Sequence, residues 1–105
     1  MARMRLTVDS SVSFGEVFKR FLLAKAAKGL ADKTLKTYQQ HLSAISKHLD
    51  TTKMIDVMSR NDLEKMTISM REAGLAANSI KSYTTTLKSF FSWCNEEGIP
   101  YLFSS

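Results

Sequence analysis

The chain has 105 residues, a net charge of +5 and a single cysteine. Its length is that of one small domain, and 44% hydrophobic with 24% charged residues is the composition of a folded protein. One cysteine excludes a disulfide framework within the chain and favours a reducing compartment, so the cytoplasm is the expected location. Apolar runs such as 21–24 are far shorter than the roughly 20 residues of a membrane span, and no secretory signal is evident at the start. We therefore expect no membrane partner.

Widely spaced glycines and a single proline divide the chain into long segments whose apolar residues recur every three or four positions. The four predicted helices span about 13–28, 32–49, 59–73 and 78–97. Ser13 and Ser59 are candidate N-caps, and residues 50–58 are predicted to form a linker that packs back onto the core. No segment alternates with the period of two that a sheet requires. The predicted fold is an all-α, compact four-helix bundle, or four helices plus the stub of a fifth at the end of the chain.

An internal repeat relates the two halves of the chain. Residues 28–49 align with residues 73–94 at a constant offset of 45 positions. The aligned pairs are Gly29/Gly74, Leu30/Leu75, Ala31/Ala76, Thr34/Ser79, Leu35/Ile80, Lys36/Lys81, Thr37/Ser82, Tyr38/Tyr83, Leu42/Leu87 and Ile45/Phe90. Two units are too few for a solenoid, so two related helical hairpins are expected to bury their apolar stripes against each other. A surface used on the second helix of one hairpin is then predicted on the other.

The sequence offers little for catalysis. It has no phosphate-binding glycine loop, no H-E-x-x-H and no G-x-S-x-G motif. His41, His48 and Cys94 are candidate metal ligands, but a zinc site needs about four ligands, and two ordinary histidines with a core thiol are the preferred interpretation. We expect no catalytic residue, cofactor, metal or small-molecule substrate for this chain.

Charge is more informative. Residues 19–47 contain seven basic residues and one acidic residue, whereas residues 50–73 contain four basic and five acidic residues. The positive charge is thus concentrated near the end of the first helix and the start of the second. This pattern fits a surface that faces phosphates, and it also fits an ordinary solvated face.

The polar faces of the two repeat helices favour nucleic acid. The candidate contact residues are Lys33, Thr34, Lys36 and Thr37 in one copy and Asn78, Ser79, Lys81 and Ser82 in the other, with Lys25, Lys28 and Lys88 as peripheral phosphate binders. Helix N-termini attract anions, and short polar side chains contact phosphates and base edges. Asn78 is the candidate base reader, because an amide can form two hydrogen bonds with adenine. The alternative is that Thr34, Asn78 and Ser79 only cap their helices.

Several dispersed motifs point to a known family. They are Phe14-Gly15-Glu16-Val17-Phe18, Gly29-Leu30 with Thr34, Tyr38 and Leu42, Asp62-Leu63-Glu64, Gly74-Leu75 with Ser79-Ile80, and Leu87-Lys88-Ser89-Phe90-Phe91-Ser92-Trp93. Over about 13–102 the chain resembles the N-terminal core-binding domain of phage-integrase-type tyrosine recombinases. The resemblance implies a sterile-alpha-motif-like (SAM-like) bundle that clamps crossover-site DNA for integration and recombination, with the second helix of each hairpin near the major groove. Relatives often carry a capping serine where Ala31 and Ala76 stand here.

The full-length enzymes of this family cut DNA with a tyrosine, assisted by basic residues and an H-x-x-R motif. His41 and His48 do not begin that motif, and Tyr101 lacks such residues upstream. We therefore expect that residues 13–103 are a DNA-binding domain, that residues 1–12 are a flexible extension, and that the catalytic domain is absent from this chain. The implied partners are double-stranded DNA, the protein's own catalytic domain and further protomers on DNA.

The alternative function is a helical protein-interaction module. It would bind a partner through apolar residues such as Met54, Met58 and Phe103, and its basic face would be incidental.

Overall fold

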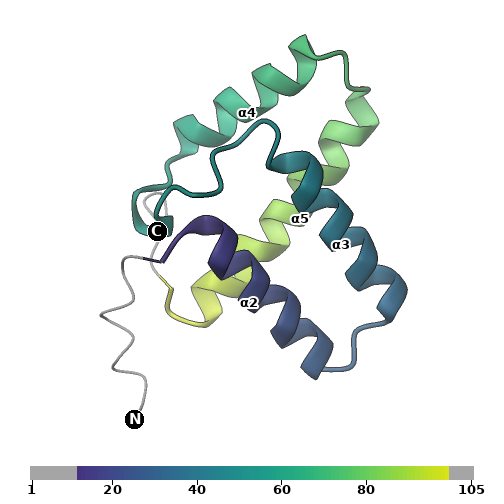
Figure 1. Ribbon diagram of the computed structural model, residues 1–105, viewed down its shortest axis with the longest axis vertical. Coiled ribbons are helices and arrows are strands. Elements are labelled where there is room, and N and C mark those ends of the chain that lie inside the picture. Colours follow the sequence, from purple (N-terminus) through teal and green to yellow (C-terminus); the bar gives the residue numbers. More distant parts are fainter. Residues whose placement is uncertain (1–11, 100–105) are drawn as a thin grey trace.

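The computed structural model describes residues 12–99, and in that range the protein is all helical, as predicted (Figure 1). The elements are α2 (Phe14–Ala27), α3 (Asp32–Ile45), the short 3-10 helix η3 (Ile55–Val57), α4 (Arg60–Glu72) and α5 (Ala77–Glu96). The expected fifth helix lies outside the described residues, and so does all but the last residue of the expected N-terminal extension. None of the described helices is long and apolar enough to span a bilayer.

The internal repeat is present in the backbone itself. The turn between α2 and α3 and the turn between α4 and α5 have the same hydrogen bonds 45 positions apart. Gly29 N donates to Ala26 O, and its equivalent Gly74 N donates to Arg71 O. Leu30 N donates to Lys25 O, and Leu75 N donates to Met70 O. Leu35 N donates to Ala31 O, and Ile80 N donates to Ala76 O. Gly29 and Gly74 have φ angles of 90° and 86°, a region that glycine adopts without steric cost. The chain is therefore built of two equivalent hairpins, as the repeat predicts.

The helix ends follow the predicted caps with one difference. The Ser13 hydroxyl accepts a hydrogen bond from Glu16 N, and Ser59 forms a reciprocal capping box with Asp62. The helix α3 ends at Ile45 rather than at the predicted Leu49. The reason is a tightened last turn, in which the amides of residues 47 and 48 bond to carbonyls three residues back. Leu49 is nevertheless buried, as its place on the apolar stripe predicts.

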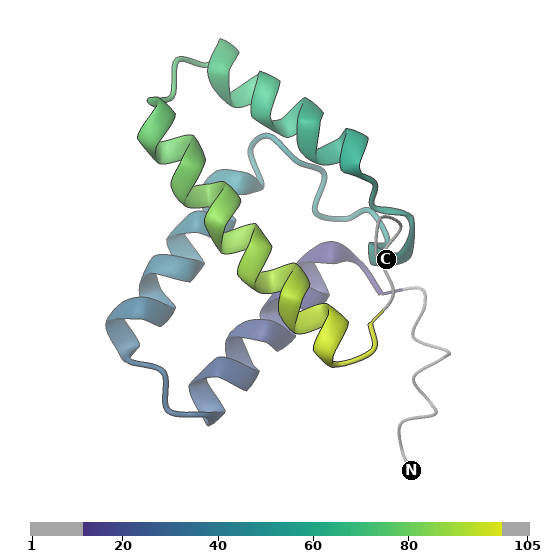
Figure 2. The same cartoon turned by 180° about the vertical axis from the view of Figure 1, so that it is seen from behind.

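Aromatic side chains of α2 and α5 form the centre of the core. Phe90 is fully buried, and its ring centroid lies 5.1 Å from that of Phe14, 4.9 Å from Phe18 and 5.6 Å from Phe21. The long helix α5 runs across α3 and α2, and it diverges from α4 beyond the turn that joins them (Figure 2). Because both hairpins contribute to one cluster, neither can be removed without exposing the core.

The linker between the hairpins packs onto the core, as predicted, and it also completes α2. Phe14 N donates to Lys53 O and Gly15 N donates to Thr51 O, each at 2.8 Å, so the linker satisfies amides of the first turn. Ile55 and Met58 are buried. The proposed use of Met58 as an exposed partner contact is therefore wrong, because its side chain fills the core. Phe103, named with it, lies outside the described residues.

Candidate nucleic-acid interface

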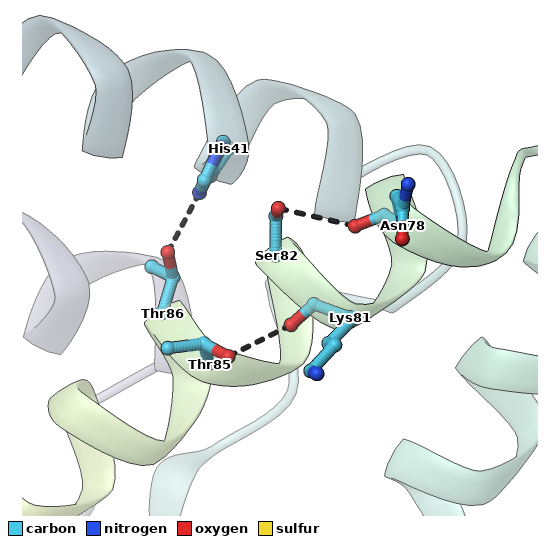
Figure 3. A pocket seen from close by; sticks show the side chains of 6 residues that line it. All are labelled: His41, Asn78, Lys81, Ser82, Thr85 and Thr86. Atoms are coloured by element: carbon cyan, nitrogen blue, oxygen red, sulfur yellow. Dashed lines mark hydrogen bonds between the residues drawn. The ribbon is translucent and has the colours of Figure 1, made fainter.

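The helices α3 and α5 cross at equivalent positions of the repeat. His41 and Thr86 are 45 positions apart, and His41 Nδ1 and Thr86 Oγ1 share a hydrogen bond of 2.6 Å (Figure 3). The His41 ring also meets the Tyr83 ring edge to face, with 5.0 Å between centroids. From this crossing the N-terminal halves of the two helices diverge (Figure 1). We call residues 32–41 the α3 arm and residues 77–86 the α5 arm.

The α5 arm presents a polar face beside the crossing. Its exposed side chains are Asn78, Lys81, Ser82 and Thr85. Together with His41 and Thr86 they line an open depression of about 420 Å³ (Figure 3). Spacings of three, four and seven residues place these groups on one side of a helix. The depression brings three of the predicted contact residues, Asn78, Lys81 and Ser82, together with side chains of the crossing.

The α3 arm repeats this face. Lys33, Lys36, Thr37 and Gln40 are exposed, and they occupy the positions equivalent to Asn78, Lys81, Ser82 and Thr85. The sequence analysis missed Gln40 and Thr85. The signal was present, because each lies seven residues, two helical turns, after a predicted contact residue on the same face.

Hydrogen bonds restrict what the hydroxyl groups on these faces can do. Thr37 Oγ1 donates to Lys33 O at 3.1 Å, Ser82 Oγ donates to Asn78 O at 3.1 Å, and Thr85 Oγ1 donates to Lys81 O at 2.9 Å. With its only proton used in this way, each hydroxyl can act outward only as an acceptor. The side-chain donors left for an anionic ligand are therefore the lysines and the amides of Asn78 and Gln40.

Thr34 and Ser79 differ from the other predicted contacts, because both are half-buried. Each lies seven residues before a residue of the crossing, on the inner side of its arm. The alternative that Thr34, Asn78 and Ser79 cap their helices is wrong. The N-cap residues are Ala31 and Ala76, and neither helix start has a side-chain cap bond.

Positive charge prevails on both arms. The α3 arm has Lys33 and Lys36 against the single acidic residue Asp32, and the α5 arm has Lys81 and no acidic residue. The N-terminal end of each helix dipole adds a partial positive charge. Burial lowers the pKa of His41 below its ordinary value of 6.5, so at neutral pH this ring adds no charge at the crossing. An anion near the crossing would thus meet three lysines on two diverging helices.

The peripheral lysines lie elsewhere. Lys28 is the exposed C-cap residue of α2. Lys25 is half-buried with its Nζ 5.7 Å from the centre of the Phe21 ring, a cation–π contact. Lys25 and Lys88 line a second depression together with Glu96, and it shares no residue with the one at the crossing.

The candidate metal ligands are not brought together. His41 bonds to Thr86, while His48 Nδ1 lies 2.8 Å from Ser69 Oγ. Within residues 12–99 no three histidine, cysteine or carboxylate side chains form a cluster suited to a metal ion. Burial raises the pKa of the Cys94 thiol to about 12, which makes it a poor nucleophile as well as a poor ligand.

Comparison with known proteins identifies the family of the chain. Residues 17–98 match the family described as the phage integrase N-terminal SAM-like domain. The chain therefore belongs to this family. It is also 30% identical over 84 residues to the tyrosine recombinase XerD of Listeria innocua serovar 6a, a match that covers 77% of the chain. The XerD of Listeria monocytogenes serovar 1/2a is 28% identical over 86 residues, or 79% of the chain. The matches cover 28% of each relative's length, and no solved structure matches the chain.

Proposed function

We propose that the chain is the DNA-binding part of a site-specific tyrosine recombinase, and that it holds duplex DNA against the exposed faces of the α3 and α5 arms. The observation that carries the proposal is the crossing at His41 and Thr86, from which two lysine-bearing helix N-termini diverge. Family membership and the likeness to two XerD recombinases support the same partner. In this proposal the described helices hold the DNA, and strand cutting is assigned to the recombinase's catalytic domain.

Affinity in this proposal comes mainly from phosphates. Lys33, Lys36 and Lys81 are exposed on the arms, and Lys28 and Lys88 are exposed outside them, so that about five phosphate contacts result if all five lysines take part. At roughly −0.9 per contact, the slope of log K against log salt concentration should be near −4.5. Base contacts are few, because the exposed faces of the two arms have one amide side chain each, Gln40 and Asn78. The isolated domain should therefore show only weak sequence preference.

The test is an NMR titration of the labelled protein with a short duplex, followed by binding measurements over a range of salt concentrations. Amide shifts should cluster at residues 33–37 and 78–85 and should fade as salt is raised. The double substitution Lys36→Ala/Lys81→Ala should reduce the slope of the salt dependence by about 1.8, the share of two contacts.

A matched control removes the same charge from the other two helices. Arg20 on α2 and Lys65 on α4 are also exposed and also 45 positions apart. The double substitution Arg20→Ala/Lys65→Ala should change the slope much less than Lys36→Ala/Lys81→Ala. Equal effects of the two pairs would show that net charge, and not the arms, determines binding. An unchanged spectrum at low salt would refute the proposal and would favour a protein-interaction module.

A further inference from the structure

The two hairpins are related by an approximate half-turn. In Figure 1 the axis lies horizontally through the point where α3 and α5 cross, and rotation about it carries α2 onto α4 and α3 onto α5. Figure 2 shows the same relation from behind. The repeated turn hydrogen bonds at the constant offset of 45 residues support the equivalence of the two halves.

Side-chain contacts place this axis at the crossing. In a two-fold arrangement, residues near the axis meet their own equivalents. His41 and Thr86 are equivalent by the repeat, and they are hydrogen-bonded to each other. The arms therefore extend from the axis in the same way. Lys36 and Lys81 each lie five residues from the crossing, about 7.5 Å along its helix.

A ligand that fits both arms equally should have matching symmetry. The two antiparallel backbones of a DNA duplex are related by two-fold axes perpendicular to the duplex, and two-fold proteins commonly align with these axes. A single strand has no such axis. The positions of Lys36 and Lys81 on either side of the crossing also suit phosphates that flank a groove about 12 Å wide.

We propose that the pseudo-two-fold axis of this domain aligns with a two-fold axis of the duplex, so that the α3 arm contacts the backbone of one strand and the α5 arm contacts the other. This inference rests on the proposed function and specifies how the DNA is held. The equivalence of the arms is not complete, because Lys33 stands where the α5 arm has Asn78. The α3 arm thus has two lysines to the α5 arm's one, and this difference gives the domain a preferred orientation on a duplex whose two backbones differ in charge.

The test compares an ordinary duplex with a duplex in which every phosphate of one strand is replaced by an uncharged methylphosphonate. If the arms contact opposite strands, every binding orientation loses about half of the contacts. The slope of log K against log salt concentration should then fall from near −4.5 to about −2.2. If all contacts are on one strand, the protein can bind with that face on the charged strand, and the slope of the salt dependence stays the same. The affinity then falls by no more than about two-fold, because one of the two strands is lost as a binding site. That result would overturn the inference.

Single substitutions give a second, independent readout. On the ordinary duplex, Lys36→Ala and Lys81→Ala should each reduce the slope by about 0.9. On the half-neutral duplex only one arm faces charged phosphates, and the unsubstituted protein places its α3 arm there because this arm has two lysines to the other's one. Lys81→Ala should then leave the slope nearly unchanged, whereas Lys36→Ala and the double substitution should each reduce it by about 0.9. A full effect of Lys81→Ala on the half-neutral duplex would contradict the two-strand arrangement.

The two proposals can fail separately. Absence of binding to the ordinary duplex at low salt would refute the proposed function together with this inference. Binding to the ordinary duplex with an unchanged slope on the half-neutral duplex would refute only the inference. Equal binding to the duplex and to single-stranded DNA of the same length would also refute only the inference.

Discussion

The hydrogen bond between His41 and Thr86 should couple the two hairpins energetically. Thr86 is 3% exposed, and Thr86→Val removes its hydroxyl while keeping the branched shape. His41 is only half-buried, so water can replace the lost partner at its ring. The loss is then the net contribution of one hydrogen bond, about 1 kcal/mol of the free energy of unfolding. For a domain of this size that is a fall in Tm of roughly 4–8 °C.

A double-mutant cycle isolates this contribution, because the valine also adds apolar contact that offsets part of the loss. We expect a coupling free energy of about 1 kcal/mol between His41→Gln and Thr86→Val. Unfolding by urea at pH 7.5 can be followed by the fluorescence of Trp93, which is 7% exposed. The cycle of His48→Gln with Ser69→Ala is the matched control for a histidine–hydroxyl pair away from the crossing.

The His41–Thr86 and His48–Ser69 pairs should differ in their effect on DNA binding. Loss of the His41–Thr86 bond should weaken binding to duplex DNA because it loosens the angle between the arms, whereas loss of the His48–Ser69 bond should not. The reasoning is refuted if the His41 and Thr86 substitutions add to within roughly 0.3 kcal/mol, since the two side chains would then be energetically independent.

Three further predictions concern stability and reactivity. Gly15→Ala should not give the stabilisation of about 1 kcal/mol that alanine ordinarily brings over glycine in a helix, because the new methyl group would lie 3.2 Å from the Thr51 carbonyl oxygen; a gain of that size in urea titrations would show that the linker yields freely. His41 has a folded-state pKa below its ordinary 6.5, so the unfolded chain takes up the proton first, and stability should decrease as the pH falls below about 6.5, with a weaker dependence in His41→Gln. Cys94 should react with a thiol reagent at pH 8 only as fast as the protein unfolds, because burial raises its pKa to about 12, and rapid labelling of the native protein would contradict this.

The capping box at the start of α4 gives a related acid dependence. Burial alone would raise the pKa of Asp62, but hydrogen bonds from Ser59 and from the Lys53 ammonium group outweigh it and hold the pKa below its ordinary value of 3.8. This carboxylate contributes stability that is present above pH 3.8 and is lost as the pH falls below it. The variant Asp62→Asn should show a flatter dependence between pH 5 and 3 in thermal unfolding, and an unchanged profile would show that other carboxylates dominate.

Local sequence patterns were sufficient to predict the secondary structure and the repeat. These patterns depend on residues within a few positions of one another. They include the caps at Ser13 and Ser59, the glycines that follow helix ends, and the apolar stripes. The same patterns failed at the end of α3, where a 3-10 turn replaces the last helical turn before Leu49. They correctly predicted that the linker 50–58 packs back onto the core, where Met58 is fully buried.

For the candidate interface, the sequence by itself determined which residues share a helix face and where basic charge is concentrated. Both are matters of spacing within one helix. The sequence did not determine that His41 and Thr86 form the crossing or that Thr34 and Ser79 face partly inward. These features depend on the angle at which α3 and α5 pack. That angle is decided by the tertiary structure, through the aromatic core that both hairpins share.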